Sequence, residues 1–198
     1  MTTTLGALCV FCGSSSGRSP LYRDGTRQFG AELARRGIDL VWGGGRVGLM
    51  GEVADAVLEG GRRAIGVIPS FLVEREIGHP RASELVVVHT MHDRKATMAA
   101  RADGFVLLPG GLGSFEEFFE VVTWAYLGLH HKPIGVLNLG GYFEPLLELL
   151  RHTAREGFAQ QKTLELIVSA DEPGALLDRL EARRAELGAP PPEALAKT

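Results

Sequence analysis

The chain has 198 residues and a net charge of −3, and its 45% hydrophobic and 23% charged residues are typical of a globular protein. This length favours one domain, and the lack of a long block of like charge argues against a nucleic-acid or membrane partner. No apolar stretch reaches the ~18 residues of a membrane-spanning helix, the first residues lack a signal-peptide pattern, and two cysteines make no disulfide framework. We therefore expect a cytoplasmic enzyme or binding protein.

Short runs of Val, Ile and Leu alternate with longer segments of helical periodicity. The runs predict strands at 7–12, 39–42, 64–68, 85–89, 104–108, 133–139 and 164–168. The helical segments lie near 20–36, 47–60, 91–102, 114–128, 142–153 and 173–186. Because continuous apolar strands are covered on both faces, the pattern predicts an α/β fold: a Rossmann-like open parallel sheet with helices on both faces. We expect one domain over 1–187 and a mobile C-terminal tail over 188–198, which contains three consecutive prolines.

The segment near 114–128 is apolar on almost every side after its first turn. A helix of this kind must be buried, and in a small domain a second subunit is a natural cover. We therefore expect a homodimer.

The 26 glycines, roughly 13% against an average near 7%, gather in clusters at the ends of apolar runs. Residues 43–48 (GGGRVG) have the G-x-G-x-x-G spacing, so a dinucleotide site, a phosphate contact and a plain tight turn are all open. The third strand ends without the acidic residue that would bind a ribose hydroxyl, which argues against NAD. Residues 13–17 (GSSSG) have the spacing of a nucleophile elbow, but no later histidine stands out as the base for Ser15. A polar loop that binds a ligand is the simpler interpretation.

Cysteine and histidine carry no strong signal. Cys9 and Cys12 have redox spacing, but they belong to an apolar strand and are expected in the core. The six histidines form no metal-ligand pattern, and no G-K-[ST] phosphate loop occurs, so we expect no metal and no P-loop ATPase.

Two loops carry the most information. Residues 109–117 (PGGLGSFEE) join a strand to a helix, and glycine amides at a helix N-terminus suit a phosphate. Ser114 and Glu117 also fit a capping box, although capping alone does not explain the glycines ahead of it. Residues 91–95 (MHDRK) follow the preceding strand. Their adjacent cations at a helix start interact unfavourably with the helix dipole, and either a negative substrate group or solvent offsets that cost. Neighbouring strands would bring both loops to one edge of the sheet.

Together these two loops resemble the paired signature of the LONELY GUY (LOG) phosphoribohydrolases. The second pattern of that family is PGGxGTxxE, so Ser114 replaces the usual Thr and keeps its hydroxyl. The resemblance covers about residues 7–145 and continues at 11–15, 43–51, 123–124 and 132–135. It implies hydrolysis of cytokinin riboside 5′-monophosphates to the free base and ribose 5-phosphate, without a cofactor. Relatives often carry the label "lysine decarboxylase", but the sequence has no lysine in a pyridoxal-phosphate context.

The resemblance also implies a set of site residues. Arg94 and Glu117 correspond to the catalytic pair of the family. The other substrate positions that carry over are Glu76, Lys95, Gly111, Leu112, Gly113, Ser114, Phe115, Glu116 and Thr123. Thr123 lies six residues beyond Glu117, about 240° around a helix, so these two do not share a face. Supporting contacts are expected from Gly13, Ser14, Ser15, Gly43, Gly44 and Gly45.

The chemistry fits these roles. A carboxylate beside C1′ could stabilise an oxocarbenium-like ribose or orient and deprotonate the attacking water, which is our hypothesis for Glu117. Arg94 would anchor the substrate and keep Glu117 ionised, while the amides of 111–114 would hold the 5′-phosphate. Glu76 could act from a nearby loop. Two alternatives stay open: a nucleosidase that acts mainly on AMP, and a non-catalytic nucleotide or cofactor carrier.

Overall fold

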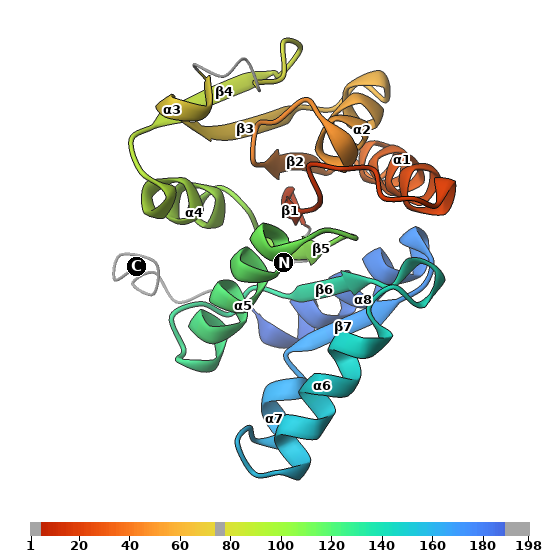
Figure 1. Ribbon diagram of the computed structural model, residues 1–198, viewed down its shortest axis with the longest axis vertical. Coiled ribbons are helices and arrows are strands. Elements are labelled where there is room, and N and C mark those ends of the chain that lie inside the picture. The colour runs from red at the N-terminus through yellow and green to blue at the C-terminus, as the bar shows by residue number, and fades with distance from the viewer. Residues whose placement is uncertain (1–4, 74–77, 189–198) are drawn as a thin grey trace.

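The computed structural model describes residues 5–73 and 78–188 as one α/β domain built on a seven-stranded parallel sheet (Figure 1). The strands run in the order β4-β3-β2-β1-β5-β6-β7. Their bounds are β1 Ala7–Phe11, β2 Asp39–Trp42, β3 Ala64–Pro69, β4 Glu84–Val88, β5 Gly104–Leu107, β6 Ile134–Leu137 and β7 Ile167–Ala170. The strand order reverses beside β1, because β2 pairs with one of its edges and β5 with the other. The predicted open parallel sheet is thus confirmed.

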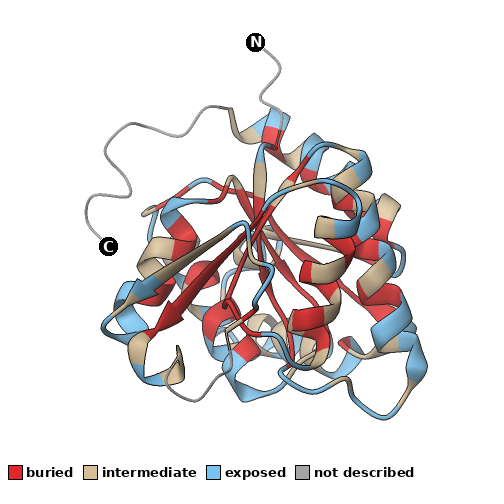
Figure 2. Ribbon diagram, turned by 90° about the horizontal axis from the view of Figure 1, so that it is seen from above, coloured by how far each residue is buried: buried red, intermediate tan, exposed pale blue. Residues whose placement is uncertain are grey.

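Helices cover both faces of the sheet. The longer helices are α1 Pro20–Arg35, α2 Gly48–Glu59, α4 Met91–Ala100, α5 Leu112–Tyr126, α6 Glu144–Arg155 and α8 Pro173–Leu187. One core forms where α1, α2 and α8 pack on the sheet, and α4 and α5 pack over the second core on the other face. Alternate residues of β1 point into these two cores, Leu8 into the first and Cys9 into the second. Figure 2 shows the buried residues gathered in the sheet and on the helix sides that face it.

The structure differs from the expected elements in a few places. The last strand was expected at 164–168, but β7 begins at Ile167 because α7, Gln161–Leu164, occupies the start of that range. The short helix α3, Ser70–Val73, and the 3-10 turn Leu139–Gly141 were not expected. The expected tail lies outside the described residues except for Gly188. Across the described residues, no helix is long and apolar enough to cross a membrane.

Helix α5 is buried on one side only within this chain. Phe118, Val121 and Val122 pack into the core, while Phe119, Tyr126 and Leu127 remain exposed. Within the single chain the sheet covers only one face of α5, so burial of the other face by a second subunit stays a prediction.

Candidate functional site

The candidate site lies at the carboxyl ends of the strands, where the strand order reverses between β1 and β5. In open parallel sheets this is the usual place for a ligand. Three loops are joined there by backbone hydrogen bonds: Gly13 N–H donates to Pro109 O (3.0 Å), and Leu49 N–H donates to Gly13 O (3.0 Å). Gly48 has a φ of 59°, and a β-carbon there would overlap the backbone of Ser14. This close approach explains the need for glycine where the 43–48 loop enters α2.

Arg94 is the centre of the site. Its side chain leaves the first half of α4 and is only 9% exposed. Its Nη1 donates to Oε1 of Glu117 (2.8 Å), Nε donates to Val67 O (3.1 Å), and Nη2 donates to Gly43 O (3.3 Å). A β-carbon at Gly43 would overlap Nη2, so the bare backbone at position 43 makes room for the guanidinium. Backbone acceptors from β3 and from the loop after β2 thus aim Arg94 at Glu117.

Glu117 lies one turn inside α5 and is 8% exposed. Burial raises its pKa above the ordinary range of a carboxyl group, while the positive charge of Arg94 works in the opposite direction. The capping-box alternative for Ser114 and Glu117 is wrong. Helix α5 begins after Gly111 without a side-chain cap, and the carboxylate of Glu117 pairs with Arg94 instead. The capping box of this region is at Thr90 and Asp93, which begin α4 and place an acidic side chain ahead of its cations.

Lys95 extends the ion pairs between α4 and α5. Its ammonium contacts the carboxylates of Glu116 and Glu120, the latter at 3.0 Å. Burial acts to lower the pKa of Lys95, but the hydrogen bonds to both carboxylates outweigh it and raise the pKa. Sequence reasoning missed Glu120. Its place one helical turn after Glu116 was the available signal, since residues i and i+4 share a helix face.

The N-terminus of α5 is open. The amides of Leu112, Gly113 and Ser114 are the first of the helix, and no side chain caps them. A β-carbon on Gly111 or Gly113 would meet nothing within 4 Å, so space remains in front of these groups. A phosphate suits such a place because free amides and the helix dipole both favour an anion. Phe115 differs, because its N–H donates to Gly111 O and its ring packs against Phe143 in the core.

A cavity of about 290 Å³ joins these features. Its lining includes Cys12, Gly13, Ser14, Met50, Met91, Arg94, Glu116, Glu117 and the backbone of 111–114. A second cavity of about 300 Å³ adjoins it and shares Gly13, Ser14 and Gly111 with it. Tyr22 and Tyr142 line that second cavity, and the Tyr142 hydroxyl donates to Gly110 O (2.6 Å). Sequence reasoning found neither tyrosine.

Four predicted substrate positions are not among the described residues that line this cavity: Lys95 and Phe115, described above, and Glu76 and Thr123. Glu76 lies outside the described residues. Thr123 is exposed on α5, its hydroxyl donates to Phe119 O (2.7 Å), and it lines a separate cavity with Tyr126 and Phe158.

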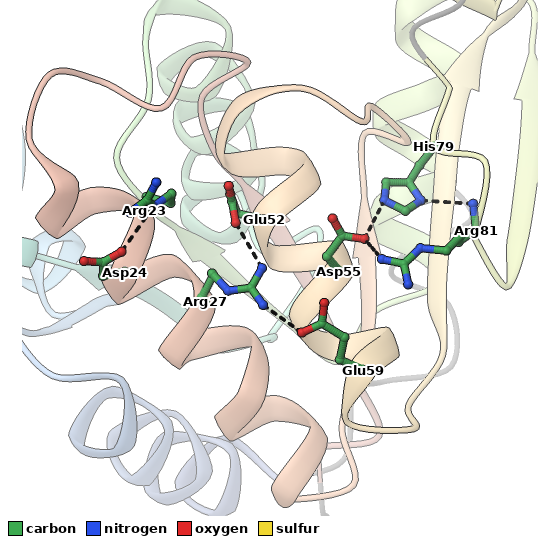
Figure 3. A network of polar contacts seen from close by, with 8 residues as sticks. All are labelled: Arg23, Asp24, Arg27, Glu52, Asp55, Glu59, His79 and Arg81. Carbon is green, nitrogen blue, oxygen red and sulfur yellow. Dashed lines mark hydrogen bonds and ion pairs between the residues drawn. The ribbon is translucent and has the colours of Figure 1, made fainter.

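Gly44 and Gly45, the other glycines of the 43–48 loop, make hydrogen bonds that stabilise the fold. Gly44 has a φ of 74° and its carbonyl accepts from His79 N–H (2.8 Å), while Gly45 O accepts from the Trp42 indole (3.1 Å). His79 is held in turn by Asp55, with Nε2 and Oδ1 3.2 Å apart (Figure 3). Figure 3 also shows this pair beside the ion pairs that Arg27 of α1 makes with Glu52 and Glu59 of α2.

The weaker chemical motifs are explained by local structure. Ser15 Oγ accepts from Gly17 N–H (3.3 Å), and within the described residues no hydrogen bond joins Ser15 to a histidine. Cys9 and Cys12 are buried, and burial raises the pKa of both thiols, as expected for core residues. No group of three or more His, Cys, Asp or Glu that could hold a metal ion occurs in the part of the chain that the structure describes.

One family model and several proteins of about 50% sequence identity match most of this chain. The family model described as "Possible lysine decarboxylase" matches residues 50–180. The cytokinin riboside 5′-monophosphate phosphoribohydrolase LOG7 of Arabidopsis thaliana is 51% identical over 174 residues, which is 88% of this chain and 80% of that protein. The probable phosphoribohydrolases LOGL2 and LOGL3 of Oryza sativa subsp. japonica are 49% and 50% identical. They match 88% and 87% of this chain and 71% and 82% of their own length.

Among solved structures, similarity extends to proteins of much lower identity. The molybdenum cofactor carrier protein of Chlamydomonas reinhardtii superposes with a TM-score of 0.68 at 17% identity, over 90% of this chain and 98% of that one. A molybdenum cofactor binding protein of Rippkaea orientalis gives 0.68 at 19% identity, over 91% and 98%. At this identity the similarity shows the fold alone.

Proposed function

The chain belongs to the LONELY GUY family of cytokinin riboside 5′-monophosphate phosphoribohydrolases, and we propose that it hydrolyses such nucleotides to the free base and ribose 5-phosphate. The observation that carries the proposal is the buried pair of Arg94 and Glu117, which lines one cavity together with the open N-terminus of α5. A cation, a carboxylate and a phosphate-binding helix end in one cavity suit the cleavage of a phosphorylated riboside.

In this proposal the 5′-phosphate binds the amides of Leu112, Gly113 and Ser114. That anchor keeps the ribose beside Glu117, one helical turn farther along α5. Fixing the phosphate in this way supplies the positional part of catalysis, since a bound sugar no longer has to find the reactive geometry.

Glu117 then acts on water and on the sugar. As the bond from C1′ to the base nitrogen breaks, its electron pair leaves with the base, and the carboxylate stabilises the positive charge on the ribose. Glu117 takes a proton from the water whose oxygen bonds to C1′, and that proton then passes to the departing base. Arg94 has two roles: its charge keeps Glu117 ionised despite burial, and it anchors the substrate. Lys95 pairs with Glu116 and Glu120 and so offsets the negative charge of Glu116, which lines the same cavity.

The test uses isopentenyladenosine monophosphate with the wild-type chain and with Glu117→Gln and Arg94→Ala. We expect both variants to lose about 10²- to 10⁴-fold in kcat, the usual range for removing a general base. Lys162→Ala, on the short helix α7 away from the cavity, is the matched control and should keep wild-type activity. Wild-type rates of base release from a folded Glu117→Gln protein would contradict the assignment.

The same assay separates the alternatives. A nucleosidase specific for AMP would show a higher kcat/KM for AMP than for the prenylated nucleotide. A carrier would bind nucleotide without releasing ribose 5-phosphate. The curated relatives at about half identity are named as hydrolases, whereas the carriers share only the fold, so the relatives favour the hydrolase.

We also propose a homodimer formed through the exposed face of α5. Phe119, Tyr126 and Leu127 leave apolar surface there, and Phe158 lies beside it across the cavity that contains Thr123. Sedimentation of the wild-type chain and of a Tyr126→Glu, Leu127→Glu variant tests this: a monomeric wild-type protein at micromolar concentration would refute it. The cytoplasmic location stays a prediction of the sequence.

A further inference from the structure

We propose that His130 and Lys132, in the loop between α5 and β6, form a positioning brace that fixes α4 relative to α5 and thereby holds Arg94 against Glu117. The inference rests on the proposed function of that pair. Both residues are buried and neither lines the cavity, so they would act through other residues and not on the substrate.

Lys132 contacts the end of α4. It is 6% exposed, and its Nζ donates to Ala99 O (2.7 Å) in the last turn of the helix that carries Arg94 and Lys95. The Ala99 carbonyl also accepts from Ala102 N–H (3.5 Å), so Lys132 is a second donor to it, and the negative end of the helix dipole attracts a cation. Burial lowers the pKa of Lys132, and the Ala99 carbonyl is the acceptor that its Nζ contacts in this buried place.

His130 contacts the middle of α5. It is 2% exposed, its Nδ1 accepts from Lys132 N–H (3.1 Å), and its Nε2 lies 2.8 Å from Val121 O. Because Nδ1 is an acceptor, the neutral ring carries its proton on Nε2 and donates it to Val121. Val121 lies four residues after Glu117, on the same face of the helix. Its carbonyl already has a partner in the helix ladder, so helix satisfaction alone does not require His130.

The two contacts form one unit, because His130 accepts directly from the backbone of Lys132. Both side chains also pack on the same ring: His130 lies 5.1 Å from the centroid of Phe105, and Lys132 Nζ lies 6.0 Å from it. Helices α4 and α5 are therefore tied twice, by ion pairs at the cavity and by this brace beneath it. Releasing the lower tie lets the helices move apart, and the separation of Arg94 and Glu117 grows.

The pH dependence of activity distinguishes positioning from mere stability. When Arg94 withdraws, burial acts on Glu117 with less opposition, so its pKa rises further and the acidic limb of the rate profile moves to higher pH. The groups that face Glu117 are Arg94 and Lys95 on α4, Glu116 and Glu120 on α5, Cys9 on β1, and Cys12 directly after β1. Burial lowers the pKa of His130 to about 4, so replacing His130 by a neutral residue changes no charge near neutral pH.

The experiment measures kcat and KM for isopentenyladenosine monophosphate from pH 5 to 9, with thermal unfolding, for the wild-type chain, His130→Leu, His130→Gln, Lys132→Met and Lys132→Arg. We expect His130→Leu and Lys132→Met to lose about 10- to 100-fold in kcat, with a smaller change in KM and an acidic limb shifted to higher pH. His130→Gln keeps a donor and an acceptor, and Lys132→Arg keeps the cation, so both should recover most of the rate.

Gly30→Ala is the control for stability, because its methyl group would crowd Ala56 between α1 and α2, on the opposite face of the sheet. It should lower the unfolding temperature without moving the acidic limb. A folded His130→Leu protein with an unshifted limb, or a Gly30→Ala protein with the same shift, would overturn the brace. Crystal structures of the wild type and His130→Leu test the brace without activity: equal separations of Arg94 and Glu117 in them would also refute it. An inactive wild-type enzyme would refute the proposed function alone.

Discussion

A single methyl group at position 43 should separate activity from folding. Gly43 lies directly after β2, and its carbonyl accepts from Nη2 of Arg94 (3.3 Å). An alanine β-carbon at this position would overlap Nη2 and lie 3.0 Å from Cζ of the guanidinium. Ordinary contacts need roughly 3.5 Å or more between carbon atoms, so the guanidinium must shift by about 1 Å or more.

The magnitude of the loss follows from what moves. The group in the way is the far end of a flexible side chain, and the φ of Gly43 is not among the positive values of this chain, so the backbone can accept alanine. We expect a modest loss of stability, about 1–3 kcal/mol, as for other overpacked sites. The shift pulls Arg94 from the 2.8 Å contact with Glu117, and a misplacement of about 1 Å can cost roughly 10²-fold in rate.

The assay measures kcat/KM with isopentenyladenosine monophosphate beside urea unfolding. Gly30→Ala is again the matched control, since it should lose stability and keep its rate. Gly43→Ala should lose rate as well, roughly 10²-fold, which is far more than its loss of about 1–3 kcal/mol in the free energy of unfolding explains while the protein stays folded. If Gly43→Ala retained wild-type kcat/KM, or lost rate only in proportion to its unfolded fraction, the spacing argument for Arg94 would fail.

Two further predictions concern charge. Glu120→Gln removes one of the two carboxylates that hold Lys95, so KM for the nucleotide should change several-fold with little effect on folding; unchanged KM and kcat would argue against a role for this contact. The free energy of unfolding at acidic pH should depend on His130, because its pKa is about 4 in the folded chain and about 6.5 when unfolded. Between pH 6.5 and 4 the unfolded chain binds this proton and the folded chain does not. The stability that the neutral His130 contributes is therefore present above pH 6.5 and is lost as the pH falls towards 4, by at most about 3 kcal/mol. Urea unfolding of His130→Gln should show a flatter pH dependence than the wild type, and equal slopes would refute the assignment.

The sheet was predictable because its central strands are short apolar runs that are buried almost throughout. The last strand shows the limit of that signal. Residues 164–168 read as an apolar run, yet Leu164 ends a short helix and the pairing with β6 starts the strand at Ile167. The apolar run alone does not define the boundary between a four-residue helix and the strand that follows. Pairing with the neighbouring strand sets where the strand begins.

The site was predictable where chain order and sheet topology decide. Loops that follow parallel strands open at the same edge of a sheet, so the 91–95 and 109–117 loops were expected there. The expected reason, neighbouring strands, is wrong, because β3, β2 and β1 lie between β4 and β5. Arg94 meets Glu117 because α4 and α5 pack over the same core and the guanidinium reaches past Val67 O and Gly43 O. Local sequence rules failed in the same stretch: Ser114 and Glu117 fit a capping box, but Glu117 pairs with Arg94 from another helix. Contacts that depend on side-chain reach, such as Tyr142 with Gly110 or Lys132 with Ala99, leave no pattern at fixed spacing.

The energetics of the Arg94–Glu117 pair argue that it is kept for chemistry. Removing two charges from water costs more than a single ion pair commonly returns, and well-packed apolar side chains often serve stability as well or better. Here one guanidinium donates to three acceptors, Val67 O, Gly43 O and Glu117 Oε1, and a glycine at position 43 leaves room for it. The carboxylate nevertheless stays in a setting where burial raises its pKa. A buried carboxylate whose pKa is raised by burial and opposed by a fixed cation is poorly suited to stabilising a fold and well suited to taking a proton from water beside a ribose.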